Sequence, residues 1–164
     1  QDQVIIACDV VNECNYFGQL KPMVEFAEAN LYEIGEEPDK ILADAGYCSQ
    51  ANLEYMDQPG SADPYIAVKK DHKQRCENVA APRGRIPKGM SLKERMERKL
   101  RTQVGKAWYR LRGQIAEAPY GQIKDCRNLA KFLLRGLEKV GGEFDLWCLT
   151  HNILKLYRHS LVAT

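Results

Sequence analysis

The chain has 164 residues, of which 45% are apolar and 28% are charged, with a net charge of +2. That length is typical of one domain with its own core, so we predict a single domain over residues 1–164. No apolar run approaches the roughly 20 residues that cross a bilayer, and the composition excludes collagen and wholesale disorder.

The charges are segregated along the chain. Residues 1–68 carry 2 basic and 13 acidic side chains, a net charge of −11, whereas residues 69–112 carry 15 basic and 4 acidic ones, a net charge of +11. Concentrated Lys and Arg can contact a phosphate backbone. They can also form a solvated basic helix, or one that pairs with the acidic segment, and the charge pattern alone leaves both interpretations open.

Strand and helix patterns alternate in the first part of the chain. Residues 4–11 are apolar and β-branched, which predicts a buried strand. Apolar residues at helical spacing predict an amphipathic helix over residues 19–34. Residues 41–43 predict a second strand that ends at Asp44. This order is typical of an α/β domain.

The next elements are a short helix and a third strand. Ser49 is a suitable N-cap for the helix, and residues 65–68 form the strand. The chain then enters the basic segment, which we expect to be a helical insertion over about residues 69–112.

Helical patterns dominate the rest of the chain. The run Ser91-Leu92-Lys93-Glu94 is a capping-box signature that opens a basic helix, and we expect Gly105 to interrupt it. Another helix continues past Pro119, which should bend or break it. Residues 141–142 are two glycines that we interpret as a linker, and residues 146–157 predict a final amphipathic helix.

Two places could hold chemistry. Asp44 follows a strand, where open α/β sheets place functional groups, although such residues also satisfy turn amides or cap the next helix. Glu117 and Lys124 are seven positions apart and would share one face of an α-helix. They could hold a metal and a neighbouring phosphate, or form a solvent-exposed charge pair.

Several runs in order resemble the catalytic domain of DDE-class insertion-sequence transposases. They include Leu42-Ala43-Asp44-Ala45-Gly46-Tyr47, Ala116-Glu117-Ala118-Pro119-Tyr120-Gly121-Gln122-Ile123-Lys124, Phe132-Leu133-Leu134-Arg135-Gly136 and Leu149-Thr150-His151-Asn152, after Cys8-Asp9-Val10-Val11-Asn12-Glu13 near the start. The resemblance implies a ribonuclease-H-like mixed sheet flanked by helices. It also implies that the first strands of that sheet lie upstream of Gln1.

The resemblance implies that Asp44 and Glu117 are catalytic residues that bind divalent metal, Mg²⁺ or Mn²⁺, and that Lys124 touches DNA. The first aspartate of the triad is expected upstream of Gln1. The family's tyrosine and arginine belong seven and four positions before the glutamate, where Arg110 and Gly113 stand. Tyr109 and Arg112 are one step away.

The function implied is metal-dependent phosphodiester cleavage and strand transfer on double-stranded DNA in the bacterial cytoplasm. Four basic residues of the predicted helix are expected to hold phosphates: Arg95, Arg98, Lys99 and Arg101. The alternative is an inactive remnant that still binds DNA or a partner. The chain could also form a homo-oligomer.

Overall fold

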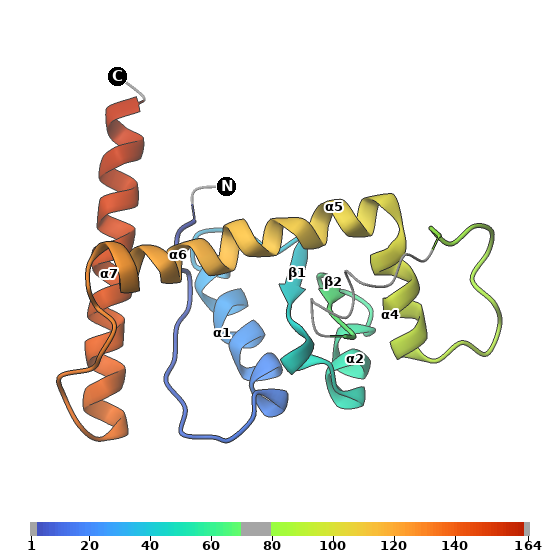
Figure 1. Cartoon of the computed structure of the whole chain (residues 1–164), viewed down its shortest axis with the longest axis horizontal. Coiled ribbons are helices and arrows are strands. Elements are labelled where there is room, and N and C mark those ends of the chain that lie inside the picture. The colour runs from blue at the N-terminus through green and yellow to red at the C-terminus, as the bar shows by residue number, and fades with distance from the viewer. Residues whose placement is uncertain (1–2, 70–79, 163–164) are drawn as a thin grey trace. The chain divides into compact units, whose positions relative to one another are not determined.

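The computed structural model describes residues 3–69 and 80–162. The chain falls into two compact units, and Figure 1 labels their helices and strands. The central unit is Asn15–Arg112, and the terminal unit combines Gln1–Cys14 with Gly113–Thr164. The prediction of a single domain stays a prediction. Part of the predicted basic insertion, residues 70–79, lies outside the described residues.

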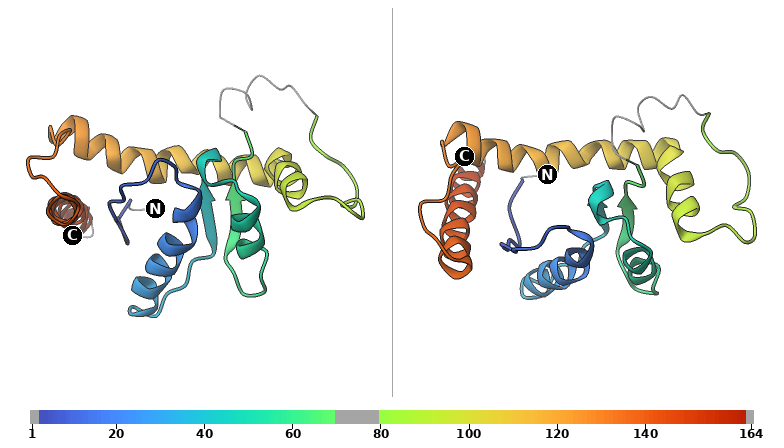
Figure 2. Two further views of the ribbon diagram at one scale, coloured as in Figure 1. Left: turned by 90° about the horizontal axis from the view of Figure 1, so that it is seen from below. Right: turned by 60° about the horizontal axis from the view of Figure 1, so that its bottom comes forward.

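A strand–helix–strand motif organises the central unit. β1 (Lys40–Ala43) and β2 (Asp63–Ile66) pair in parallel, and α2 (Gln50–Met56) connects them. In both views of Figure 2 the strands lie next to each other, with α1 (Leu20–Tyr32) on the side of β1 and α2 on the side of β2. The strand predicted at residues 41–43 is confirmed. The third strand begins and ends two residues earlier than predicted.

Local capping signals account for where the helices of this unit begin. The Ser49 hydroxyl accepts a hydrogen bond from the Asn52 amide at 3.1 Å, so Ser49 caps α2 as predicted. At α4 (Leu92–Arg101), Ser91 and Glu94 form the predicted reciprocal capping box. The 3₁₀ turn η1 (Phe17–Gln19) leads directly into α1.

Gly105 does not interrupt a helix, which corrects the prediction. The break falls at Thr102, between α4 and α5 (Gln103–Arg112). A Cβ atom at Gly105 would lie only 2.0 Å from the Lys99 carbonyl oxygen. The glycine therefore lets the first turn of α5 approach the end of α4, and the sequence signal reflects this close contact.

The core of the central unit is apolar and continuous. Its buried members are Leu20, Val24, Ala43, Leu53, Met56, Tyr65, Ile66, Met96 and Leu100. They come from α1, both strands, α2 and α4, so burial of these side chains stabilises the unit as a whole. Ile66 is fully buried, with 0% of its surface exposed.

The predicted strand at residues 4–11 is wrong, because these residues of the terminal unit form no strand and pair with none of the described strands. Side chains of α7 (Leu137–Val162) instead form hydrogen bonds with part of this backbone. The Asn152 amide donates to the Ile5 carbonyl at 2.7 Å and accepts from the Ile5 amide at 2.8 Å. His151 Nε2 bonds the Gln3 carbonyl at 2.8 Å. A strand pattern needs a neighbouring strand, and the described residues provide none here.

Helical backbone continues past Pro119 with two changes of pitch. The π-helical turn η3 (Gly113–Glu117) precedes α6 (Ala118–Gly121), and a second π-helical turn, η4 (Gln122–Cys126), follows it. Proline lacks the amide hydrogen, and its ring crowds the carbonyl four residues earlier. The wider η3 turn relieves this crowding. The helix is not broken at Pro119, and the predicted bend there stays a prediction.

α7 is longer than predicted. It spans Leu137–Val162 and includes Gly141 and Gly142, so the interpretation of these glycines as a linker is wrong. The predicted final helix at residues 146–157 is confirmed as its central part. Glycine lowers helix propensity by only about 1 kcal/mol per residue, which packing of the surrounding turns can offset. Among the described residues, no helix is long and apolar enough to cross a membrane.

Candidate nucleic-acid and metal site

Asp44 lies at the carboxyl end of β1, where the chain enters the 3₁₀ turn η2 (Ala45–Tyr47). Its Oδ1 accepts a hydrogen bond from the Gly46 amide at 2.8 Å, so one oxygen caps the turn. The side chain is exposed to solvent. The turn-capping interpretation of Asp44 is therefore correct for one oxygen, and the same bond orients the exposed carboxylate at a strand end where ligands commonly bind.

Gly46 leaves room for this carboxylate. A Cβ atom at Gly46 would lie 3.0 Å from Asp44 Oδ1, closer than side-chain carbons normally approach an oxygen. Tyr47 follows, and its ring lies 6.1 Å from that of Tyr16. Burial raises the pKa of the Tyr47 hydroxyl, and the negative charge of Asp44 raises it further, so Tyr47 stays protonated near neutral pH.

A buried amide in α2 fixes the position of the Asp44 turn. Asn52 donates from Nδ2 to the Tyr47 carbonyl at 2.7 Å and to the Phe17 carbonyl at 2.8 Å. It therefore ties η2 to η1, and its burial makes both bonds costly to lose. The role of Asn52 was not predicted from the sequence. The available signal was a polar side chain beside Leu53 on the inner face of the predicted helix.

Glu117 lies in the terminal unit as the last residue of η3. Its side chain is exposed, and Oε2 lies 3.7 Å from the place where a Cβ atom of Gly113 would be. The carboxylate therefore folds back along the π-helical turn. Such turns are rare, and many of those known occur at functional sites.

The π-helical turn fits the one-residue offset from the tyrosine, arginine and glutamate spacing that the resemblance implies. Tyr109 and Arg112 stand one position too early relative to Glu117. A π-helical turn closes over one residue more than an α-helical turn, so η3 accommodates one extra residue between Arg112 and Glu117. The Arg112 guanidinium lies 5.4 Å from the centre of the Tyr109 ring, which keeps these two side chains together.

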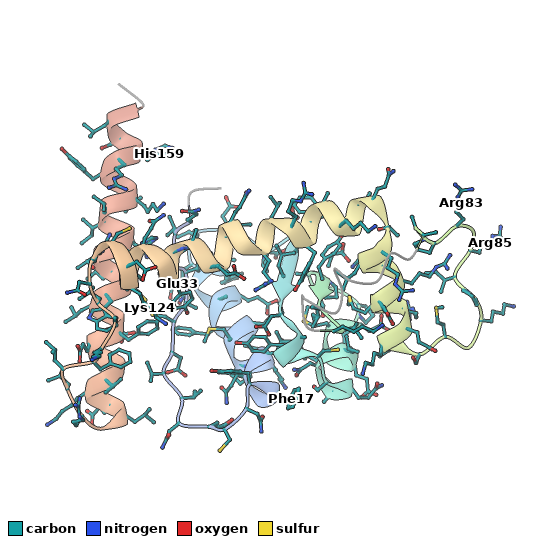
Figure 3. All side chains as sticks on the ribbon, in the orientation of Figure 1. Phe17, Glu33, Arg83, Arg85, Lys124 and His159 are labelled. Carbon is teal, nitrogen blue, oxygen red and sulfur yellow. The ribbon has the colours of Figure 1, made fainter. Side chains whose placement is uncertain are left out.

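Lys124 lies in η4, and its side chain is exposed (Figure 3). The expectation that Lys124 and Glu117 share a face assumes 3.6 residues per turn throughout. The π-helical backbone at η4 takes more residues per turn, so side chains seven positions apart are stacked less closely than in an α-helix.

The four basic residues of α4 predicted to hold DNA all have partners within the central unit. Arg95 lies 3.6 Å from the Asp57 carboxylate, and Arg101 bonds Glu97 at 2.5 Å. Arg98 donates to the carbonyls of Arg83 and Gly84 at 2.9 Å. These contacts agree with a basic helix that pairs with neighbouring groups.

Lys99 makes the densest of these contacts. Its ammonium bonds the Asp63 carboxylate, donates to the Pro64 carbonyl at 2.8 Å and lies 4.1 Å from the centre of the Tyr65 ring. Burial alone would raise the pKa of Asp63, but the Lys99 and Tyr65 hydrogen bonds and nearby positive charge hold it below its usual value. Lys99 therefore joins α4 to the start of β2.

The loop before α4 displays basic side chains that belong to the basic segment at residues 69–112. Arg83 and Arg85 are exposed and extend outward from the loop (Figure 3). The backbone of the same loop is bound by Arg98. The fixed loop presents these two guanidinium groups to solvent, where they suit contact with phosphate.

The candidate metal ligands belong to different units. Asp44 lies in the central unit and Glu117 in the terminal unit, so the hypothesis that they share metal ions stays a prediction. Over residues 3–69 and 80–162, no three His, Cys, Asp or Glu side chains are grouped to hold a metal. Carboxylates are nevertheless the ligands that Mg²⁺ prefers, so the chemistry of both residues fits such an ion.

A family model described as the transposase DDE domain matches residues 69–157, more than half of the chain. The chain therefore belongs to the transposase DDE domain family. The matched residues include Glu117 and Lys124, whereas Asp44 precedes them. No curated protein and no solved structure matches the chain. Membership indicates a role in DNA transposition. The structure is an α/β fold, and its described residues contain a partial, two-stranded parallel sheet.

Proposed function

We propose that the chain is part of a DNA transposase that cleaves phosphodiester bonds and transfers strands with divalent metal. The family match over Glu117 and Lys124 is the observation that carries this proposal. The exposed Asp44 carboxylate, oriented by Gly46 at the end of a parallel strand, supports it independently.

In this proposal Asp44 and Glu117 are ligands for Mg²⁺ or Mn²⁺. When bound, such ions supply a hydroxide nucleophile and stabilise the leaving 3′ oxygen of DNA. Asp44 offers a carboxylate whose orientation is set before metal arrives, because its Oδ1 is held by the Gly46 amide. The ribonuclease-H-like arrangement of the complete sheet is part of this proposal.

DNA contact is assigned to basic groups that extend into solvent. Lys124 is exposed in η4, seven residues after Glu117, and Arg83 and Arg85 are exposed in the loop before α4. Arg98 contributes by holding that loop, through its bonds to the Arg83 and Gly84 carbonyls. Each phosphate neutralised should add about 0.9 to the slope of log binding constant against log salt.

A plasmid nicking assay with Mg²⁺ or Mn²⁺ tests the enzymatic part. We expect Asp44→Asn and Glu117→Gln each to abolish nicking, because each removes one metal-binding charge. Asp39→Asn and Glu138→Gln are matched controls, since both replace exposed carboxylates away from the proposed ligands. Equal activity in the ligand variants and the controls would reject the assignment.

Metal titration gives a second readout that does not depend on turnover. The Asp44→Asn chain should bind Mn²⁺ more weakly than the Asp39→Asn chain, measured by calorimetry. Gel shifts that persist in both ligand variants, with no nicking by the unaltered chain, would instead support the inactive DNA-binding remnant. In gel shifts, Arg83→Ala and Arg85→Ala should reduce the salt dependence of DNA binding.

A further inference from the structure

Two thiols and a carboxylate meet where the start of the chain lies against α7, within the terminal unit. Cys8 Sγ donates a hydrogen bond to Asp145 Oδ1 at 3.4 Å. The thiols of Cys8 and Cys148 are also hydrogen-bonded to each other. Asp145 and Cys148 are three positions apart in α7, so they lie on the same side of the helix. Cys8 therefore lies against that side, with a second thiol as its neighbour.

The two thiols differ in their access to solvent. Cys8 is partly exposed, whereas only 4% of the Cys148 surface is exposed. A small oxidant therefore reaches Cys8 first. An oxidised sulfur at Cys8 then has a shielded thiol in contact with it, and in this arrangement a second cysteine converts the first oxidation product into a disulfide.

Contacts that do not involve sulfur hold the thiol pair together. His151 Nε2 bonds the Gln3 carbonyl at 2.8 Å, and the Asn152 amide exchanges hydrogen bonds of 2.7 and 2.8 Å with the Ile5 backbone. The start of the chain is thus attached to α7 by polar contacts as well as by the thiols. A disulfide forms only where the two backbones stay close together, and the polar attachments limit that separation in the reduced chain.

We propose that Cys8 and Cys148 form a disulfide when the chain is exposed to a peroxide, so that oxidation ties the start of the chain to α7 by a covalent bond. The Cys8 thiolate attacks one oxygen of hydrogen peroxide and the O–O bond breaks. The other oxygen leaves as hydroxide and takes up the Cys8 proton as water, so Cys8 becomes a sulfenic acid.

The second step closes the disulfide. The Cys148 thiolate attacks the Cys8 sulfur, the S–O bond breaks, and the departing hydroxide takes up the Cys148 proton as water. In total, the two thiols are oxidised to one disulfide, and one hydrogen peroxide is reduced to two water molecules. The inference concerns these thiols alone and does not depend on the proposed transposase activity.

The surroundings of Cys8 make the first step slow. Burial raises the pKa of the Cys8 thiol, the Cys148 thiol raises it further, and the Asp145 carboxylate adds to both effects. The thiolate is the form that attacks peroxide, so oxidation proceeds slowly at neutral pH, and a reducing environment keeps both cysteines as thiols.

Peptide mapping of the whole chain by mass spectrometry tests the proposal. The chain is treated with excess hydrogen peroxide, remaining thiols are blocked, and the chain is digested without reductant. We expect a cross-linked peptide that contains Cys8 and Cys148 and that dithiothreitol separates. Cys8→Ser and Cys148→Ser should each abolish it. Cys126→Ser is the matched control, since Cys126 is an exposed thiol of the same unit, and it should retain the cross-link.

Two further measurements follow the attachment and its rate. Amide hydrogen exchange at residues 4–7 should slow by about tenfold on oxidation, because the segment can no longer leave α7. The Cys8→Ser chain, treated in the same way, should show no such slowing. Asp145→Asn should form the cross-link several-fold faster, because it removes a negative charge that disfavours the Cys8 thiolate.

Two outcomes would overturn the proposal. One is the absence of the Cys8–Cys148 peptide after an exposure that oxidises Cys126 completely. The other is cross-linking of Cys8 to Cys14 or Cys126 as often as to Cys148, which would indicate random pairing of thiols. An Asp145→Asn chain that is oxidised no faster than the unaltered chain would reject the role given to Asp145.

Discussion

The two units are stabilised in different ways. The central unit has a continuous apolar core drawn from α1, α2, α4 and both strands. The terminal unit relies on an aromatic cluster around Trp147 and on side chains of α7 that bond the backbone of residues 3–5, while several leucines of α7 stay exposed. The comparison teaches that the central unit buries a continuous apolar core, whereas the terminal unit combines a smaller aromatic cluster with polar attachments and keeps several large apolar side chains exposed.

Each unit contains one tryptophan, so the comparison can be measured directly. Trp108 lies in α5 of the central unit, where the Lys40 ammonium is 4.4 Å from the centre of its ring. Trp147 is buried in the terminal unit. In a Trp147→Phe chain, fluorescence reports unfolding of the central unit, and in a Trp108→Phe chain it reports the terminal unit.

Removing the centre of the apolar core should have the largest effect. Ile66→Ala deletes a side chain with 0% exposure, and we expect the free energy of unfolding reported by Trp108 to fall by about 3–4 kcal/mol. Ile86→Ala is the control, because Ile86 is 56% exposed. Comparable losses in the two variants would contradict the core described for this unit.

A methyl group at the contact between α4 and α5 should cost less, but still substantially. Gly105→Ala places a Cβ atom against the Lys99 carbonyl, and we expect a loss of about 2–3 kcal/mol in chemical unfolding followed by Trp108. No atom lies within 4 Å of the corresponding position at Gly18. Gly18→Ala should therefore be close to neutral, and a neutral Gly105→Ala would refute the close contact.

The polar attachment in the terminal unit should have an intermediate effect. Asn152→Ala removes both hydrogen bonds to Ile5, and we expect a loss of about 1–2 kcal/mol in unfolding reported by Trp147. Residues near the start of the chain should also become more sensitive to protease. Arg158→Ala, at an exposed position of the same helix, is the control. No change in either measurement for Asn152→Ala would refute the attachment.

The Lys99–Asp63 pair should have the smallest effect and a defined pH dependence. The folded-state pKa of Asp63 is lowered, so the pair stabilises the central unit above the unfolded pKa of about 3.9 and loses this contribution as the pH falls further. Half of the Asp63 side chain is exposed, so we expect less than about 1 kcal/mol at neutral pH. Asp63→Asn should remove this part of the acid sensitivity in unfolding followed by Trp108. If Asp63→Asn loses stability at acid pH as much as the unaltered chain does, the Lys99–Asp63 pair makes no such contribution.

Local signals predicted local structure well. The Ser91 capping box and the Ser49 cap specify helix starts through contacts three residues away, and both are confirmed. Residues 4–11 were predicted to form a strand because of their composition, but a strand also needs a partner, which composition does not encode. Gly105 was correctly noticed and wrongly interpreted, because its role is a contact between two helices.

The candidate site was predictable in part. The position of Asp44 at a strand end followed from the apolar run before it, and its orientation by Gly46 agrees with the turn motif. Asn52 was not predicted, because its hydrogen bonds reach Phe17, 35 residues away, and Tyr47, 5 residues away, and neither contact follows from a local pattern. The metal-binding roles of Asp44 and Glu117 remain predictions, since they depend on long-range packing that periodicity does not reveal.

The π-helical turn before Pro119 bears on how relatives of this chain can be recognised. A search pattern with fixed gaps between tyrosine, arginine and glutamate rejects any protein that has gained a single residue there. One π-helical turn accommodates an inserted residue, and the helical segments on both sides keep their structure. Patterns that permit one extra position ahead of the glutamate should therefore retrieve divergent transposases that strict spacing overlooks.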